Sequence, residues 1–234
     1  MPPKPTIEQS KFNEMTGNIN GSLSRKEKEY LQRRQIILDA ALKLFSAKGY
    51  AGASMQEIAQ ASEFSIGTLY NFFETKESLY HTIVEEKFRQ AKESIETALL
   101  DENECVDKIG KAVGALLRFT EENREFFNIF LGLRTAPEAS LHGGIHEKVM
   151  KYYQEHVRFF QELMQEGIWE GMFRDFSSLD LALSLIGNCN AVIHDWLMGP
   201  GDNSLMAQHA RILDLFFHGA LKHPSGEKQK RGQS

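Results

Sequence analysis

The residues best suited to binding chemistry lie between Ser54 and Lys76, where hydroxyl groups, an asparagine, a glycine and a lysine stand close together. Hydroxyl and ammonium groups can donate hydrogen bonds to phosphate oxygens, and an asparagine amide can pair with a base edge. A glycine, having no Cβ, lets the backbone approach a ligand closely. The stretch therefore suggests non-covalent recognition of a nucleic acid, with candidate contacts from Ser54, Ser65, Ile66, Gly67, Thr68, Tyr70, Asn71 and Lys76.

Helix-start signals divide this stretch into short elements. The run Ser54–Glu57 (S-M-Q-E) has the pattern of a capping box, and Ser65 can cap a second helix three residues after the first one ends near Ala61. Thr75 can cap a third, longer helix that should extend to about Leu100. Two short helices joined by so brief a turn have the dimensions of a helix-turn-helix, whose second helix enters the major groove of DNA.

The second of these helices is two-sided. At about 100° per residue, Leu69, Phe72 and Phe73 cluster on one side, whereas Gly67, Tyr70 and Asn71 project to the other. Ile66 and Thr68 lie on the margins. An ordinary amphipathic helix with a polar outer face would show the same periodicity, so the pattern alone leaves both interpretations open.

The residues themselves favour the DNA-binding interpretation. The segment I-A-Q-A-S-E-F-S-I-G-T-L-Y-N-F-F-E-T-K-E-S-L, from Ile58 to Leu79, closely resembles the pattern of the tetracycline-repressor (TetR) family. Upstream, the segment A-A-L-K-L-F-S-A-K-G-Y from Ala40 to Tyr50 is similar to the first helix of that family and its closing glycine. The resemblance covers about residues 30 to 85 and implies a homodimeric repressor that binds a palindromic operator in double-stranded DNA.

Two positions depart from the family pattern. Ser62 and Glu63 replace Ala-Gly in the turn, so a left-handed backbone position there would be occupied by Glu63 at modest cost. Phe72 stands where the family often has a Tyr or His that touches phosphate. Because Phe72 cannot donate a hydrogen bond, it is excluded from the expected phosphate contacts.

The periodicity of the rest of the chain predicts an all-helical fold. The full sequence of 234 residues is 41% hydrophobic and 25% charged. We expect a disordered arm (1–24), a helix-turn-helix DNA-binding domain (25–85), a larger helical effector-binding and dimerisation domain (86–222) and a loose basic tail (223–234). Further helices are predicted near 105–119, 124–133, 145–170, 178–198 and 203–222. The net charge of -5 does not exclude DNA binding, because only the contacting surface must be positive.

A cluster of basic residues precedes or opens the first helix. These residues, which could extend a DNA-binding surface, are Arg25, Lys26, Lys28, Arg33 and Arg34. A solvated, charged helix start explains most of them better.

The C-terminal domain is rich in aromatic residues. Such a stripe is more often plain core than a ligand site, but the resemblance implies a small effector between these helices, here expected to be apolar or aromatic. The candidate pocket residues are Phe127, Phe130, Phe160, Met164, Cys189 and His194. A TetR-like regulator without an effector remains an alternative, as does a helical module that binds a protein partner.

Apolar stripes on the last two helices suggest the dimer interface, and the stripe on the final helix is wide enough to serve both the core and a partner. They consist of Leu181, Leu185, Cys189, Val192 and Trp196 on one helix, and Ile212, Leu213, Phe216, Phe217, Ala220 and Leu221 on the other. Paired across a twofold axis, the two helices would form a four-helix interface.

Several other functions find no support in the sequence. Cys105 and Cys189 are expected to be free, buried thiols, and no signal peptide or membrane span is recognised, so we expect a cytoplasmic protein. The pair His142 and His146 flanks two glycines and has no further ligand at metal-binding spacing, so no metal is expected. Nucleotide-binding and hydrolase motifs are not found either. We therefore expect neither an enzyme nor a cofactor.

Overall fold

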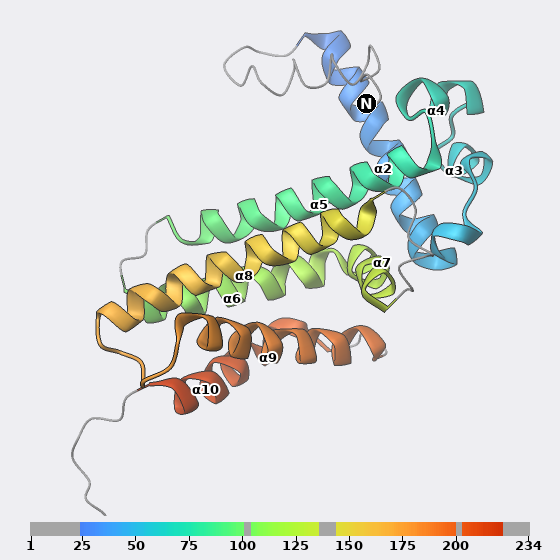
Figure 1. Cartoon of the computed structure of the whole chain (residues 1–234). Coiled ribbons are helices and arrows are strands. Elements are labelled where there is room, and N and C mark those ends of the chain that lie inside the picture. The colour runs from blue at the N-terminus through green and yellow to red at the C-terminus, as the bar shows by residue number, and fades with distance from the viewer. Residues whose placement is uncertain (1–23, 101–103, 136–143, 200–202, 222–234) are drawn as a thin grey trace, which may run out of the picture. The chain divides into compact units, whose positions relative to one another are not determined.

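The computed structural model describes residues 24–100, 104–135, 144–199 and 203–221. All regular secondary structure in these ranges is helical, and the one other feature is an isolated antiparallel bridge between Phe173 and Leu221. This confirms the predicted all-α class. In chain order the elements (Figure 1) are α2 (Arg25–Gly52), α3 (Met55–Ala61), α4 (Ile66–Phe72), α5 (Lys76–Ala98), α6 (Cys105–Glu122), α7 (Arg124–Thr135), α8 (Ile145–Trp169), α9 (Ser178–Met198), the 3-10 helix η2 (Leu205–Gln208) and α10 (His209–Ala220). The predicted basic tail and all of the predicted arm except Ser24 lie outside the described residues.

The observed helices closely follow the predicted ones. Thr75 begins α5, since its hydroxyl accepts the Ser78 amide at 3.0 Å, and α5 ends at Ala98. Regular helix in α2 breaks at Gly49, which has a φ of 70° and a ψ of 170°, a conformation that residues with a Cβ rarely adopt. The positions of helix starts and of the breaking glycine were therefore predictable from local sequence.

The contacts divide the chain into two compact units, and each has its own core. The first comprises the residues through Arg89 together with Glu125–His146, and the second comprises Gln90–Arg124 with Glu147–Ser234. The functional boundary expected at residue 85 stays a prediction.

In the first unit, α2, α3 and α4 pack around a small apolar core that also takes in the start of α5. Its fully buried side chains include Ile37, Phe45, Ile58, Leu69 and Leu79. The Tyr80 ring lies edge-on to Phe45, with centroids 5.0 Å apart. Each seven-residue helix, α3 and α4, is too short to be stable alone, so its orientation depends on this shared core.

In the second unit, α6, α9, η2 and α10 pack against one another. Gly167 of α8 permits close packing, because a Cβ there would come within 2.4 Å of the Phe173 ring and 2.9 Å of the Cys105 sulfur. Arg124 closes the C-terminal end of α9 by donating to the carbonyl oxygens of Leu197 and Gly199 at 3.1 and 2.9 Å. Cys105 and Cys189 are both free and buried, as expected.

The apolar stripes predicted as a dimer interface belong largely to this core. Leu181, Leu185 and Cys189 are buried, and on α10 so are Ile212, Phe216 and Ala220. These six residues therefore supply the core, and the use of the stripes in a dimer interface stays a prediction. A helix that covers a core must turn its widest apolar face inward, so sequence periodicity detects that face first.

The outward faces of the same two helices carry other apolar residues. Leu183 on α9 is 42% exposed and Leu215 on α10 is 58% exposed. Near them a groove of about 480 Å³ lies between α9 and α10, lined in part by Ala191, Asp195 and Arg211. Val192, Trp196 and Ile212 of the predicted stripes line the same groove, so the exposed surface of these helices adjoins the stripes.

Candidate nucleic-acid interface

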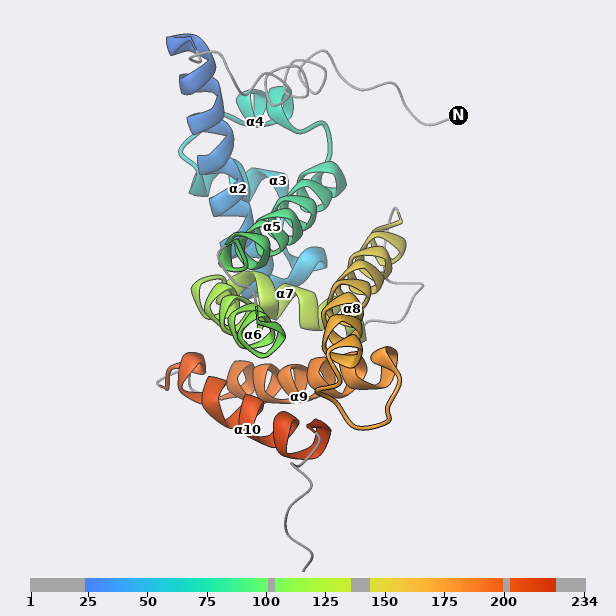
Figure 2. The same ribbon diagram turned by 90° about the vertical axis from the view of Figure 1, so that its left-hand side faces the viewer.

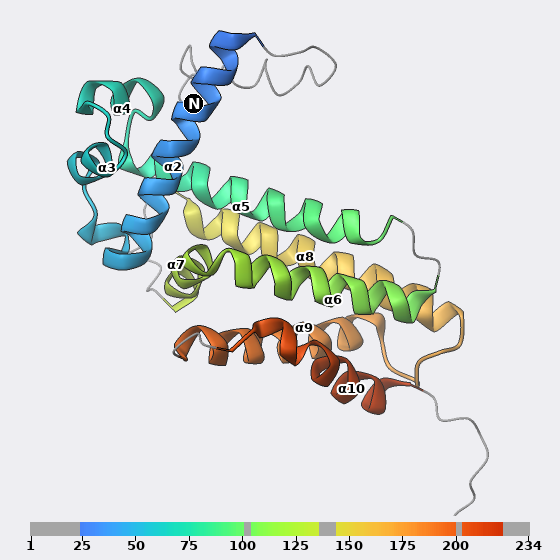
Figure 3. The ribbon, with the colours of Figure 1, turned by 180° about the vertical axis from the view of Figure 1, so that it is seen from behind.

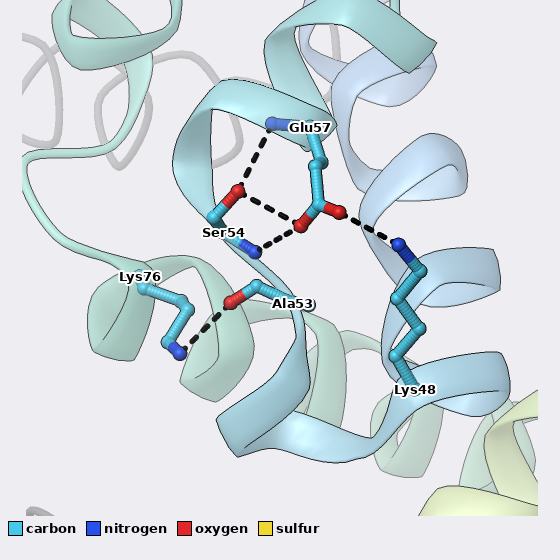
Figure 4. Close-up of polar contacts among 5 residues, drawn as sticks. All are labelled: Lys48, Ala53, Ser54, Glu57 and Lys76. Carbon is cyan, nitrogen blue, oxygen red and sulfur yellow. Dashed lines mark hydrogen bonds and ion pairs between the residues drawn. The ribbon is translucent and has the colours of Figure 1, made fainter.

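The start of α3 is held by the predicted capping box (Figure 4). The Ser54 hydroxyl accepts the Glu57 amide at 3.2 Å and donates to a Glu57 carboxylate oxygen at 2.8 Å. The same oxygen accepts the Ser54 amide at 2.9 Å. Because the hydroxyl hydrogen of Ser54 is directed to Glu57, Ser54 has no hydrogen free to donate to a phosphate in this arrangement.

Glu57 also links α3 to α2. Lys48 donates from its ammonium to the other carboxylate oxygen at 2.6 Å. The hydrogen bond from Lys48, followed by those from Ser54, lowers the pKa of Glu57 from its ordinary 4.5 to about 2. The ionised carboxylate therefore stabilises both the helix start and its attachment to α2.

The turn between α3 and α4 contains the two residues that depart from the family pattern. Glu63 has a φ of 59°, which confirms that this turn requires a left-handed residue. Ser62 is buried, and its hydroxyl donates to the carbonyl oxygens of Ile58 and Ala59 at 2.8 and 3.1 Å. The Ser62 hydroxyl thus has hydrogen-bond acceptors at the end of α3, and the turn forms without a glycine.

Ser65 caps α4 as predicted, with its hydroxyl accepting the Thr68 amide at 3.1 Å. The two side-chain hydroxyls of Ser65 and Thr68 also lie 2.8 Å apart in a hydrogen bond. A bonded hydroxyl pair of this kind holds one hydrogen inside the pair and presents the other to solvent.

The two faces of α4 are as expected from its periodicity, with one exception. Leu69 and Phe73 are buried, whereas Gly67 and Asn71 are exposed and Tyr70 is 49% exposed. A Cβ added at Gly67 would meet only the Ser65 hydroxyl, at 3.9 Å. Among the described residues, packing therefore does not require a glycine at position 67, and the backbone there is open to close approach by a partner.

The exception is Phe72, which is half-buried rather than part of the inner face. Its ring stacks on that of Tyr30 in α2, with centroids 4.8 Å apart and an angle of 28° between the planes. Tyr30 was not among the candidate residues predicted from the sequence. The available signal was its position seven residues before Ile37, on the face of α2 that reaches the core.

Lys76 was predicted from the sequence to contact phosphate, but its ammonium is hydrogen-bonded within the protein. The ammonium donates to the carbonyl oxygens of Tyr50 and Ala53 at 2.8 and 2.9 Å, and it lies 4.4 Å from the centre of the Tyr50 ring. Figure 4 shows the bond to Ala53. Two of its three N–H groups are thereby used to bind the C-terminal end of α2, where the carbonyls lack helical partners.

The residues proposed for an effector pocket fall in different parts of the fold. Phe127 and Phe130 belong to the first unit and form an aromatic cluster with Phe88 and Phe126. Phe160, Met164 and Cys189 are buried in the second unit.

His194 is exposed on α9, on the same outward face as Leu183 and Ala191. It therefore does not line the interior of its own protomer, and its assignment to an internal pocket was wrong.

Within the residues that the structure describes, no three His, Cys, Asp or Glu side chains gather as a metal site would need, and His142 lies outside them. Among the helices in the described ranges, none combines the length and the apolar character required to cross a bilayer.

The Glu57 network predicts a specific pH dependence of stability. Because the carboxylate pKa is lowered in the folded state, its contribution is present above about pH 4.5 and is lost as the pH falls towards 2. Glu57→Gln should therefore lower the melting temperature most at pH 6, and the difference from wild type should shrink between pH 4.5 and 2.5. Glu63→Gln is the matched control, since Glu63 forms no ion pair within the described ranges. Equal differences at pH 6 and pH 3 would contradict the prediction.

The comparisons with known proteins agree with this geometry. Residues 37–83 match the model of "Bacterial regulatory proteins, tetR family", and residues 102–220 match that of "Tetracyclin repressor-like, C-terminal domain". The fatty acid metabolism regulator protein of Bacillus subtilis is 21% identical over 204 residues, which cover 84% of this chain and 98% of that protein.

Solved structures show the same fold at low sequence identity. The regulator FadR from Bacillus subtilis in complex with stearoyl-CoA has a TM-score of 0.69 and 19% identity, covering 79% of this chain and 98% of that chain. A transcriptional regulator from Saccharomonospora viridis in complex with choline has a TM-score of 0.72 and 19% identity, covering 82% and 99% of the two chains. Together, the two matched models span both the helix-turn-helix and the helical C-terminal region, and the chain belongs to the TetR family of bacterial regulatory proteins.

Proposed function

We propose that this protein is a cytoplasmic transcriptional repressor that binds a palindromic operator as a homodimer through α4 and is released by a small apolar or aromatic effector. The observation that carries the proposal is the outward face of α4. There Gly67 leaves open surface, and Tyr70 and Asn71 project from a helix whose other side is anchored by Leu69 and Phe73. A helix anchored on one side and open on the other fits the major groove.

The exposed residues of α4 have different roles in this proposal. The Asn71 amide reads a base edge, and the apolar side chain of Ile66, 38% exposed, contacts a thymine methyl group. The Tyr70 hydroxyl and the hydroxyl pair of Ser65 and Thr68 donate to phosphates. Gly67 allows the backbone to come close enough for these contacts.

Ser54 and Lys76 act through other residues. Ser54 holds the start of α3, and Lys76 joins the beginning of α5 to the end of α2. Both orient the helix pair without touching DNA, which replaces the direct contacts predicted for them from the sequence.

The effector proposal rests on the apolar interior and on two relatives. The first unit contains the cluster of Phe88, Phe126, Phe127 and Phe130, and a related FadR structure holds stearoyl-CoA, whose acyl chain is long and apolar. The choline complex of a second relative shows that the fold accommodates other ligand chemistry. Release of DNA requires that the effector bind the non-DNA-binding conformation more tightly, because equal affinity would shift no equilibrium.

The outward face of α9 and α10 is the proposed dimer surface. Leu183 and Leu215 supply exposed apolar area, and Gly187 has open space where a Cβ would stand. Asp195 and Arg211 line the same groove with opposite charges. A twofold axis brings each surface against its own copy, so a patch carrying both charges can pair with itself.

Selection from random DNA duplexes followed by affinity measurement tests the recognition helix. The wild-type protein should enrich an inverted repeat. Asn71→Ala should weaken binding by about 1–3 kcal/mol and relax preference at one or two base positions. Gly67→Leu should abolish specific binding while helical content by circular dichroism stays unchanged. If no inverted repeat is enriched, or if both variants bind like wild type, α4 is not the reading helix.

Lys76→Ala distinguishes positioning from phosphate contact. Loss of two charge-assisted hydrogen bonds to carbonyls should lower the free energy of unfolding by about 2–4 kcal/mol. Affinity for all duplexes should fall, but the slope of log affinity against log salt should stay at its wild-type value. A fall of about one unit in that slope would instead identify Lys76 as a phosphate contact.

Leu183→Glu and Leu215→Glu test the dimer surface. Each places a charge on the outward face, and each variant should be a folded monomer at micromolar concentration by light scattering, with weakened operator binding. Leu100→Glu is the matched control, because Leu100 is 79% exposed in the turn after α5, and this variant should remain dimeric. Variants that stay dimeric would show that the interface lies elsewhere. Phe216→Glu should simply unfold, since Phe216 is 5% exposed.

A further inference from the structure

The first turns of α2 carry exposed cations that the fold does not use. Lys26, Lys28 and Arg33 are exposed and form no ion pair within the described part of the chain. Their neighbours are used differently, because Arg25 pairs with Glu29 and Arg34 pairs with Glu86. Three positive charges therefore remain available on this segment for an external partner.

These cations do not all point the same way. With about 100° per residue, Lys26 and Arg33 lie within roughly 60° of Tyr30 around the helix axis, whereas Lys28 lies about 160° away from it. Lys26, Tyr30 and Arg33 therefore form one face of α2, which we call the Tyr30 face. Lys28 stands on the opposite side.

The Tyr30 face is the side of α2 that meets α4. Tyr30 stacks on Phe72 at a centroid distance of 4.8 Å, and Phe72 is the last residue of α4. In Figures 1, 2 and 3 the N-terminal end of α2 and α4 lie at the same end of this unit. The stack thus places Lys26 and Arg33 beside the helix whose outer face is proposed to read DNA.

We propose that Lys26 and Arg33 bind the phosphate backbone of DNA next to the segment that α4 reads, an inference that rests on the proposed function. Ammonium and guanidinium groups are the side chains that most often neutralise phosphates. Phe72 cannot donate a hydrogen bond to a phosphate, but its ring holds the segment that carries the two cations. The N-terminal turns of α2 therefore enlarge the DNA-binding surface beyond the helix-turn-helix.

Phosphate contacts have a signature that base contacts lack. Each contact releases counterions, so the slope of log affinity against log salt falls by about 0.9 in magnitude when one contact is removed from duplex DNA. Base preference should not change, because phosphates carry no direct sequence information.

The experiment compares two double variants of the full-length protein. Lys26→Gln with Arg33→Gln removes the cations of the Tyr30 face, and Lys28→Gln with Lys43→Gln removes the same net charge from other faces of α2, where Lys43 is also exposed. The probes are an inverted-repeat duplex from the selection described above and a scrambled duplex of the same composition. Affinities are measured at several salt concentrations, and circular dichroism confirms that both variants are folded.

We expect the first variant to lose about 1.8 units of slope on both duplexes while keeping wild-type base preference. The second variant should retain the wild-type slope. Equal losses in both variants would mean that only net charge matters, and no loss in the first would mean that α2 does not touch DNA. Either result overturns the inference. If the wild-type protein binds neither duplex, the proposed function itself fails, which separates the two failures.

Discussion

The arrangement of the DNA-binding region depends on the ammonium of Lys76, which binds two carbonyl oxygens at the C-terminal end of α2. α3 and α4 have seven residues each, and such short helices are not stable in isolation. They are inserted between the end of α2 and the start of α5, so their orientation depends on how those two ends are joined. The last carbonyls of α2, which follow the break at Gly49, have no further helical turn to bond them and would otherwise depend on water.

Internal use of polar groups determines which groups remain for a ligand. Ser54 and Glu57 satisfy each other, Lys48 neutralises Glu57, and the hydroxyl of Ser62 is bonded within the turn. The polar groups that remain exposed form a small set on α4, where the backbone at Gly67 is open. A surface made of few exposed groups on a well-anchored helix loses little conformational freedom when it binds, which favours specific recognition.

The aromatic contact between Tyr30 and Phe72 affects both the packing of α2 and the placement of its charged residues. It extends the packing of α2 beyond the core residue Ile37, and it orients charged residues of α2 with respect to α4. Because Phe72 has no polar tip, its ring contributes packing and no hydrogen bond. In the second unit, inward packing of α9 and α10 leaves Leu183 and Leu215 on an outward surface.

The sequence by itself determined the helical class, the starts of α3, α4 and α5, the break at Gly49 and the two faces of α4. These features depend on caps and on hydrophobic periodicity, which act between residues at most four apart. It also identified Glu63 as the residue that would occupy a left-handed position if the turn needed one.

Only the tertiary structure decided where Lys76 donates its hydrogen bonds, that Tyr30 stacks on Phe72, and which faces of α9 and α10 are buried. Lys76 lies 23 residues after Ala53 in the sequence, and Phe72 lies 42 residues after Tyr30. No local pattern encodes which distant groups will meet. For α9 and α10, burial in the core and pairing with a second copy both select apolar residues, and only packing distinguishes the two faces.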